Sequence, residues 1–148
     1  MSLKLLKIVF GNAQIGITTD GGTYEVFINA TGSSSVKGTI VVASKTVQGG
    51  VSTAPAGSVV PIGVIYETGI DVGQKVKVVT YGKAQVLLAS DQTSSTGFWC
   101  GVSSAEEGKM YQEANAPIGT SAHNQEIGHS LQTVSTAGAL SLVQLHFN

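Results

Sequence analysis

Apolar and polar residues alternate with a period of two along much of this chain, which is the pattern of strands that bury one face. In residues 75–78, for example, Val76 and Val78 alternate with Lys75 and Lys77. Turn residues such as Gly, Pro and Asp separate the alternating segments and the short apolar runs. The pattern predicts strands, or strand-like stretches, at residues 4–9, 14–17, 24–28, 39–42, 59–66, 98–100 and 143–147.

Two segments predict more specific local structures. Residues 75–89 indicate a hairpin, because Tyr81-Gly82-Lys83 offers a tight bend between two strand-like halves. At most a short helix is expected within residues 103–117, where Ser103 precedes Glu106 at the spacing of a capping box but Gly108 interrupts the segment. Pro117 ends that segment. The expected fold class is therefore all-β: a small, turn-rich β-barrel or β-sandwich with at most one short helix.

A small and polar connector at residues 30–35 predicts a boundary between two parts of the chain. Residues 1–34 are expected to form an N-terminal arm or strand segment, and residues 35–148 a β-rich domain. The apolar stretches before the connector would leave strand edges exposed, which proteins usually avoid. They need a partner, which is either this protein's own sheet or another protein.

The composition excludes several classes of function. Charged residues make up 11% of the 148 residues, the net charge is −1, and all eight basic residues are lysines. A nucleic-acid-binding protein needs a basic face and usually arginine, so nucleic acid is not an expected partner. The longest nearly apolar run, residues 59–66, is far shorter than the roughly 20 residues that span a bilayer. Neither a membrane partner nor a signal peptide is expected. The low charge suits subunit contacts, whose cores are depleted in charge.

Candidate catalytic and metal-binding residues are few. His123, Glu126 and His129 have a spacing that fits neither one helix face nor one strand face, so ordinary hydrogen-bonded histidines are expected. Cys100 lies in an apolar strand-like segment and is expected to be an inert small hydrophobe. We therefore predict no enzymatic activity and no catalytic, cofactor-binding or metal-binding residues.

The aromatic residues allow a second interpretation. Trp99, together with Tyr66, Tyr81 and Tyr111, could form a stacking platform for a sugar. Packing in a core or an interface is the competing interpretation for the same residues. A carbohydrate-binding or adhesion β-domain, displayed on a virion or a cell surface, is accordingly the alternative function.

The second part of the chain contains six segments whose order along the sequence resembles that of a known family. They are SVKGTIV at 35–41, PIGVIYE at 61–67, GIDVGQKV at 69–76, GKAQVL at 82–87, AHNQEIGHSL at 122–131 and LHFN at 145–148. In this order they resemble the capsid decoration, or cement, proteins of tailed bacteriophages, broadly the lambda head-decoration type and related phage head proteins. The resemblance covers about residues 35–148.

The resemblance implies a structural virion protein that forms a homotrimer on the exterior of the phage head. Its partner would be the phage major capsid protein, whose lattice it would stabilise after synthesis in the host cytoplasm. In this family the N-terminal segment often reaches the capsid surface and can add a strand to it. Here the capsid-contacting residues would be Leu5, Ile8, Val9, Ile15 and Ile17.

Overall fold

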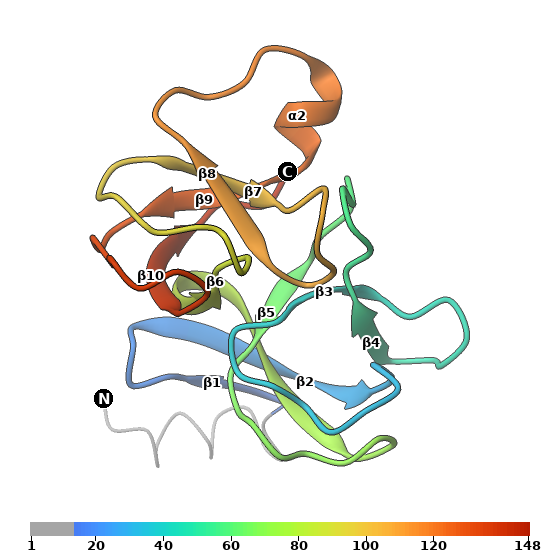
Figure 1. Cartoon of the computed structure of the whole chain (residues 1–148). Helices are drawn as coiled ribbons and strands as arrows, with labels where there is room; N and C mark the ends of the chain where they lie inside the picture. The colour runs from blue at the N-terminus through green and yellow to red at the C-terminus, as the bar shows by residue number, and fades with distance from the viewer. Residues whose placement is uncertain (1–13) are drawn as a thin grey trace.

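The structure is a computed structural model that describes residues 14–148. Strands dominate it, and one five-residue helix is present in the described range, which confirms the expected all-β class. The elements, drawn in Figure 1, are β1 (Ile15–Ile17), β2 (Gly22–Asn29), β3 (Ile40–Ala43), β4 (Gly50–Thr53), β5 (Gly63–Ile65), β6 (Lys75–Leu87), β7 (Trp99–Val102), β8 (Met110–Glu113), α2 (Thr120–Asn124), β9 (Glu126–Ser130) and β10 (Leu140–Leu145).

The first group of strands closes into a ring. β2 pairs in parallel with β4, and antiparallel pairings then connect β4 to β3, β3 to β5, and β5 to β6. The pairing of β6 with β2 completes the circle. One apolar cluster is shared by strands around this ring; its buried members are Val41, Val51, Ile65, Val76 and Val78, and Phe27 of β2 packs against them. The alternating valines of the sequence thus fill a small barrel.

A second group of strands continues from the same sheet. The later part of β6 pairs with β10, which is followed by β9, β7 and β8. A parallel bridge between Leu88 and Met110 places the start of β8 beside Leu88, the residue that directly follows β6. A larger apolar cluster lies in this half, with Val86, Cys100 and Ile127 among its fully buried members, and it extends to Ile40 and Val64 of the first group. Figure 1 shows the two groups one above the other, with β6 running from one to the other.

The predicted hairpin at residues 75–89 is wrong. Residues 75–87 form a single 13-residue strand, β6, that changes partners near Gly82 instead of reversing. Gly22 of β2 pairs with Gly82, whereas Lys83 already pairs with Gln144 of β10. Gly82 has a φ of 83°, a conformation that glycine adopts readily. The bend that the sequence indicated is real, but it redirects the strand from one barrel to the other.

Residues 103–117, where at most a short helix was expected, contain no helix. Ser103 Oγ does accept hydrogen bonds from the N–H groups of Ala105 and Glu106, as a cap would. The Glu106 carboxylate, however, accepts from the N–H of Ser90. Gly108 then takes a φ of 67°, and its carbonyl accepts from the N–H of Ile40. The segment is therefore a capped turn that leads into β8, and the short helix lies further on, at Thr120–Asn124.

The expected boundary between residues 34 and 35 does not separate β2 from the sheet. β2 pairs with β6 from Gly22 to Ile28, and its end pairs with β4. The buried side chain of Asn29 donates hydrogen bonds to the carbonyls of Ser33 and Ile70, which hold the connector against the barrel. Residues 22–29 thus find their partner in this protein's own sheet. The predicted contacts Leu5, Ile8 and Val9 lie outside the described residues.

Candidate functional site

In the described part of the chain, β1 lies at one end of the strand order. This three-residue strand pairs antiparallel with β2, and no other strand within residues 14–148 pairs with it. Ile15 and Ile17 share one face of β1 and are 40% and 52% exposed, respectively. The ring of Tyr24 lies where a side chain on Gly16 would be, so the neighbouring position is covered by β2. Two of the five predicted contact residues therefore lie next to each other on an accessible strand.

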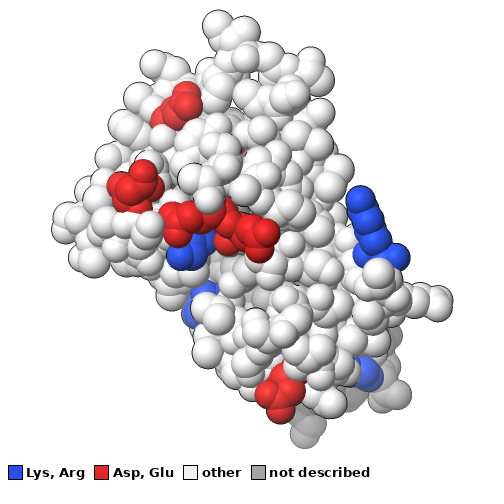
Figure 2. All heavy atoms as spheres, turned by 45° about the vertical axis from the view of Figure 1, so that its right-hand side comes forward, with Lys and Arg blue, Asp and Glu red and all other residues white. Residues whose placement is uncertain are grey.

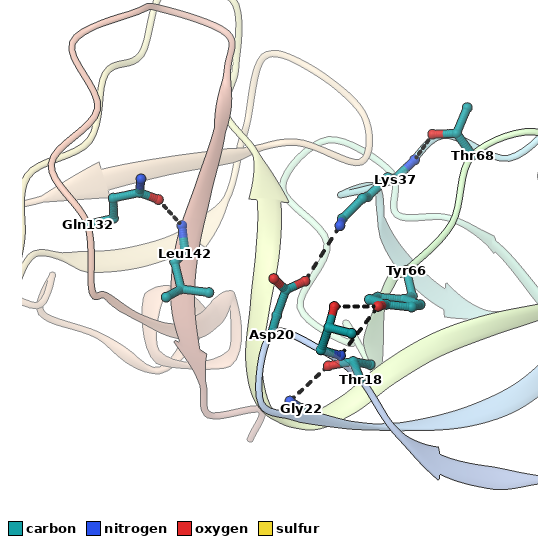
Figure 3. Close-up of polar contacts among 9 residues, drawn as sticks. Thr18, Asp20, Gly22, Lys37, Tyr66, Thr68, Gln132 and Leu142 are labelled. Atoms are coloured by element: carbon teal, nitrogen blue, oxygen red, sulfur yellow. Dashed lines mark hydrogen bonds and ion pairs between the residues drawn. The ribbon is translucent and has the colours of Figure 1, made fainter.

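Polar contacts hold the β1–β2 turn firmly against the barrel (Figure 3). Thr18 Oγ1 accepts a hydrogen bond from the N–H of Gly22, and the hydroxyls of Thr19 and Tyr66 are 3.0 Å apart. Lys37 Nζ lies 3.5 Å from Asp20 Oδ2 and 5.1 Å from the centroid of the Tyr66 ring. The 3.5 Å separation makes an ion pair rather than a hydrogen bond, and Asp20 Oδ2 has no hydrogen-bond donor. These contacts fix the turn between β1 and β2 and therefore the direction of β1 relative to the barrel.

Charged residues make up only 11% of the whole chain. Figure 2 shows a face on which most spheres are uncharged, with several carboxylates side by side near its middle, a lysine next to them, and the other charged groups scattered. Several large apolar side chains are exposed on loops and on β6 as well as on β1; besides Ile15 and Ile17 they are Val36, Val59, Val60, Val72, Tyr81, Ile118 and Leu131. Such a surface suits contacts with other protein surfaces, because charged groups are costly to bury in them.

All three histidines of the chain converge on one carboxylate. Glu126 is buried at the start of β9, and its oxygens lie 3.6 Å from His123 Nδ1, 3.9 Å from His129 Nδ1 and 3.5 Å from His146 Nδ1. His146 was not among the candidates from the sequence, because it follows β10 and no spacing connects it to the others. In the described part of the chain, no three such side chains are arranged to hold one metal ion.

Cys100 is a core residue of β7. Its side chain is fully buried, and burial raises the pKa of the thiol from 9.0 to about 12. A nucleophilic cysteine needs the opposite environment, one that stabilises the thiolate. The thiol is therefore protonated and shielded at neutral pH.

The aromatic residues do not share a common surface. Trp99 is buried, and its ring meets that of Tyr111 edge to face, with centroids 5.6 Å apart. Tyr66 lies beside Lys37 at the β1–β2 turn, whereas Tyr81 is 73% exposed on β6. Trp99 is thus not available for stacking on a sugar from solvent, and its role is to pack inside the protein.

One open hollow of about 620 Å³ lies at the end of the first barrel. Its wall consists mainly of the turn between β5 and β6, with Asp71 and Lys75 as the charged residues. Ile28 of β2 completes it. The hollow brings together no group of titratable side chains beyond this one carboxylate and one ammonium.

A scan against protein-family models and a search of the curated proteins both found no match for this chain. Within the described residues, no helix has the length and apolar character needed to cross a membrane.

Proposed function

We propose that this protein is a non-enzymatic structural component of a phage virion, which binds the outer surface of the major capsid protein lattice and stabilises the head. The observation that carries the proposal is the edge of β1. An anchored strand whose outer edge pairs with no other strand within residues 14–148, and which has two exposed isoleucines on one face, is suited to strand addition. Backbone hydrogen bonds would supply the affinity, and Ile15 and Ile17 would occupy apolar pockets of the capsid surface.

The rest of the molecule suits a structural role. The two rings of strands are filled by apolar residues and share β6, so that the β1 edge sits on a rigid body. The surface is poor in charge (Figure 2), as expected for a protein that forms extensive subunit contacts. Cys100, the single cysteine, is buried and protonated, which supports a role without nucleophilic chemistry at that residue.

A homotrimer on the lattice belongs to the same proposal. Three β1 edges held in one assembly would engage a symmetric shell together, so modest individual contacts would add up to strong binding. Light scattering at micromolar concentration should give three times the mass of the chain. A protein that remains a monomer both in solution and on shells would contradict the trimer.

The decisive experiment measures co-sedimentation of the protein with undecorated capsid shells of the phage that encodes it. The variant I15K/I17K places two charges on the exposed face of β1, and we expect it to lose shell binding. V72K is the control, since Val72 is 51% exposed and lies outside β1, on the loop between β5 and β6. Circular dichroism checks that both variants are folded. Equal binding by I15K/I17K and the original protein would refute the β1 contact.

A further inference from the structure

The pairing register places Ile17 and Tyr81 in one row of the sheet. Thr23 of β2 lies between them, because it pairs with Ile17 of β1 and also with Tyr81 of β6. Both pairings are antiparallel, and directly opposite residues of antiparallel strands have their side chains on the same face. With neighbouring strands about 4.8 Å apart, the row from Ile17 to Tyr81 spans about 10 Å.

The side chains at both ends of this row are exposed. Ile17 is 52% exposed and Tyr81 is 73% exposed, whereas Thr23 is partly buried between them. The next row on the same face of β1 and β2 consists of Ile15 and Glu25, which are both exposed. Three large apolar side chains and one carboxylate therefore lie on one face of the sheet.

The opposite face of β1 is different. Gly16 pairs with Tyr24 there, and the Tyr24 ring fills the space that a side chain on Gly16 would occupy. Lys77 Nζ lies 5.2 Å from the centroid of the same ring. Side chains of β2 and β6 thus cover this second face. The exposed apolar side chains of β1 are on the face that it shares with Tyr81.

We propose that Ile15, Ile17 and Tyr81 form one continuous contact face for the major capsid protein, with the Tyr81 ring as its anchor. This inference rests on the proposed function, because it extends the contact at β1 across the sheet to β6. The occupant is an apolar patch of the capsid protein that lies next to the segment bound along β1. The continuity of the three side chains on one face favours this partner over a separate one for Tyr81.

Tyrosine is suited to the role of an anchor. Its ring provides a large contact area and loses little conformational freedom on binding, and tyrosines are frequent among the residues that dominate binding energy. Tyr81 lies in the interior of the 13-residue strand β6, directly before the crossing at Gly82. The ring therefore projects from a rigid part of the molecule.

The first test measures co-sedimentation of the full-length protein with undecorated capsid shells. Tyr81→Ala removes the ring, and we expect roughly tenfold weaker binding, as for a dominant interface residue. Tyr81→Phe keeps the ring and should bind like the original protein. Ile118→Ala removes another exposed apolar side chain, in the loop before α2, and should also bind normally. Figure 1 shows α2 at the top of the molecule and β1 in its lower half.

The outcomes separate this inference from the proposed function. Equal binding by Tyr81→Ala and the original protein would overturn the contact at Tyr81. The loss of binding expected for I15K/I17K would in that case still support the contact at β1. Failure of the original protein to bind shells would overturn both.

A second measurement does not depend on how much the ring contributes to affinity. Tyr81→Cys introduces an exposed thiol, and a polarity-sensitive maleimide dye should label it selectively, because Cys100 is buried and protonated. We expect the emission of the dye to shift to shorter wavelength when shells are added, and a dye on Ile118→Cys to show no shift. Unchanged emission at position 81 in shell-bound protein would overturn the proposal. So would short-wavelength emission in the free protein, since a second copy of this chain would then cover the face.

Discussion

Gly22 and Gly82 face each other across β2 and β6 at the point where β6 leaves the first barrel for the second. A side chain on Gly82 would place its Cβ 2.8 Å from the carbonyl oxygen of Gly21, and one on Gly22 would meet Val79. The two strands can cross here only because both positions lack a side chain. This close approach allows one strand to serve both barrels.

Gly82→Ala is expected to destabilise the protein by about 2–3 kcal/mol, because it adds a steric clash to the strain of a positive φ. Gly32→Ala is the matched control. Gly32 has a similar φ of 86° but no atom within 4 Å of the added Cβ, so only the strain of about 1 kcal/mol should appear. Urea unfolding measures both values. Equal losses of unfolding free energy in the two variants would show that the added Cβ at Gly82 meets no steric clash.

Cys100 should make the protein less stable in alkaline solution. The pKa of the thiol is about 12 in the folded protein, against 9.0 as its ordinary value. Above pH 9 the unfolded chain loses this proton while the folded protein keeps it, so the free energy of unfolding falls as the pH rises. The loss due to this group should reach about 1 kcal/mol at pH 10.

Comparison with Cys100→Ala at each pH isolates the contribution of the thiol. Iodoacetamide provides an independent check, since the folded protein should remain unlabelled at pH 8 and the urea-unfolded chain should react. Rapid labelling of the folded protein would contradict the buried position. Cys100→Ala, and likewise His129→Ala, should leave binding to capsid shells intact.

Glu106 should contribute to stability at neutral pH and lose that contribution in acid. The N–H of Ser90, which donates to its carboxylate, lowers the pKa of Glu106, and Lys109 and the Ser90 hydroxyl add to the effect. The contribution is present above the carboxyl's unfolded pKa and is lost as the pH falls through the lowered value. Glu106→Gln should therefore flatten the acid limb of the stability curve. Glu107→Gln, at the exposed neighbouring position, should leave it unchanged.

A chain that begins at Ser33 is expected to be unfolded or insoluble. The truncation removes β2, which pairs with both β6 and β4 and closes the first ring. It also removes Phe27 from the apolar cluster and exposes the edge of β6. Circular dichroism and size-exclusion chromatography test this expectation. A soluble, folded product would show that residues 35–148 form a domain by themselves.

The period-two pattern was sufficient to predict the all-β class and several strands. Alternation of valines with lysines at residues 75–78 marks one buried face, and the same face is buried in β6. The bend at Gly82 was also visible, because a glycine within an alternating segment interrupts it. These features are local, so the sequence contains the information for them.

Strand partners were not predictable, since alternation states which face is buried but not which strand lies alongside. Lys83 pairs with Gln144, a residue some sixty positions later, and this pairing turned a predicted hairpin into one continuous strand. The same holds for residues 103–117, where a bond from Ile40 to the carbonyl of Gly108 competes with a helix.

The sequence by itself determined that this protein is a charge-poor, turn-rich β structure whose single cysteine is buried. Only the tertiary structure decided that β2 belongs to the barrel, that β6 serves two rings, and that His146 joins His123 and His129 around Glu126. The physical reason is the same in each case. Strand pairing and ion pairs across a barrel connect residues that are distant in the chain, and their energy depends on closure of the whole sheet.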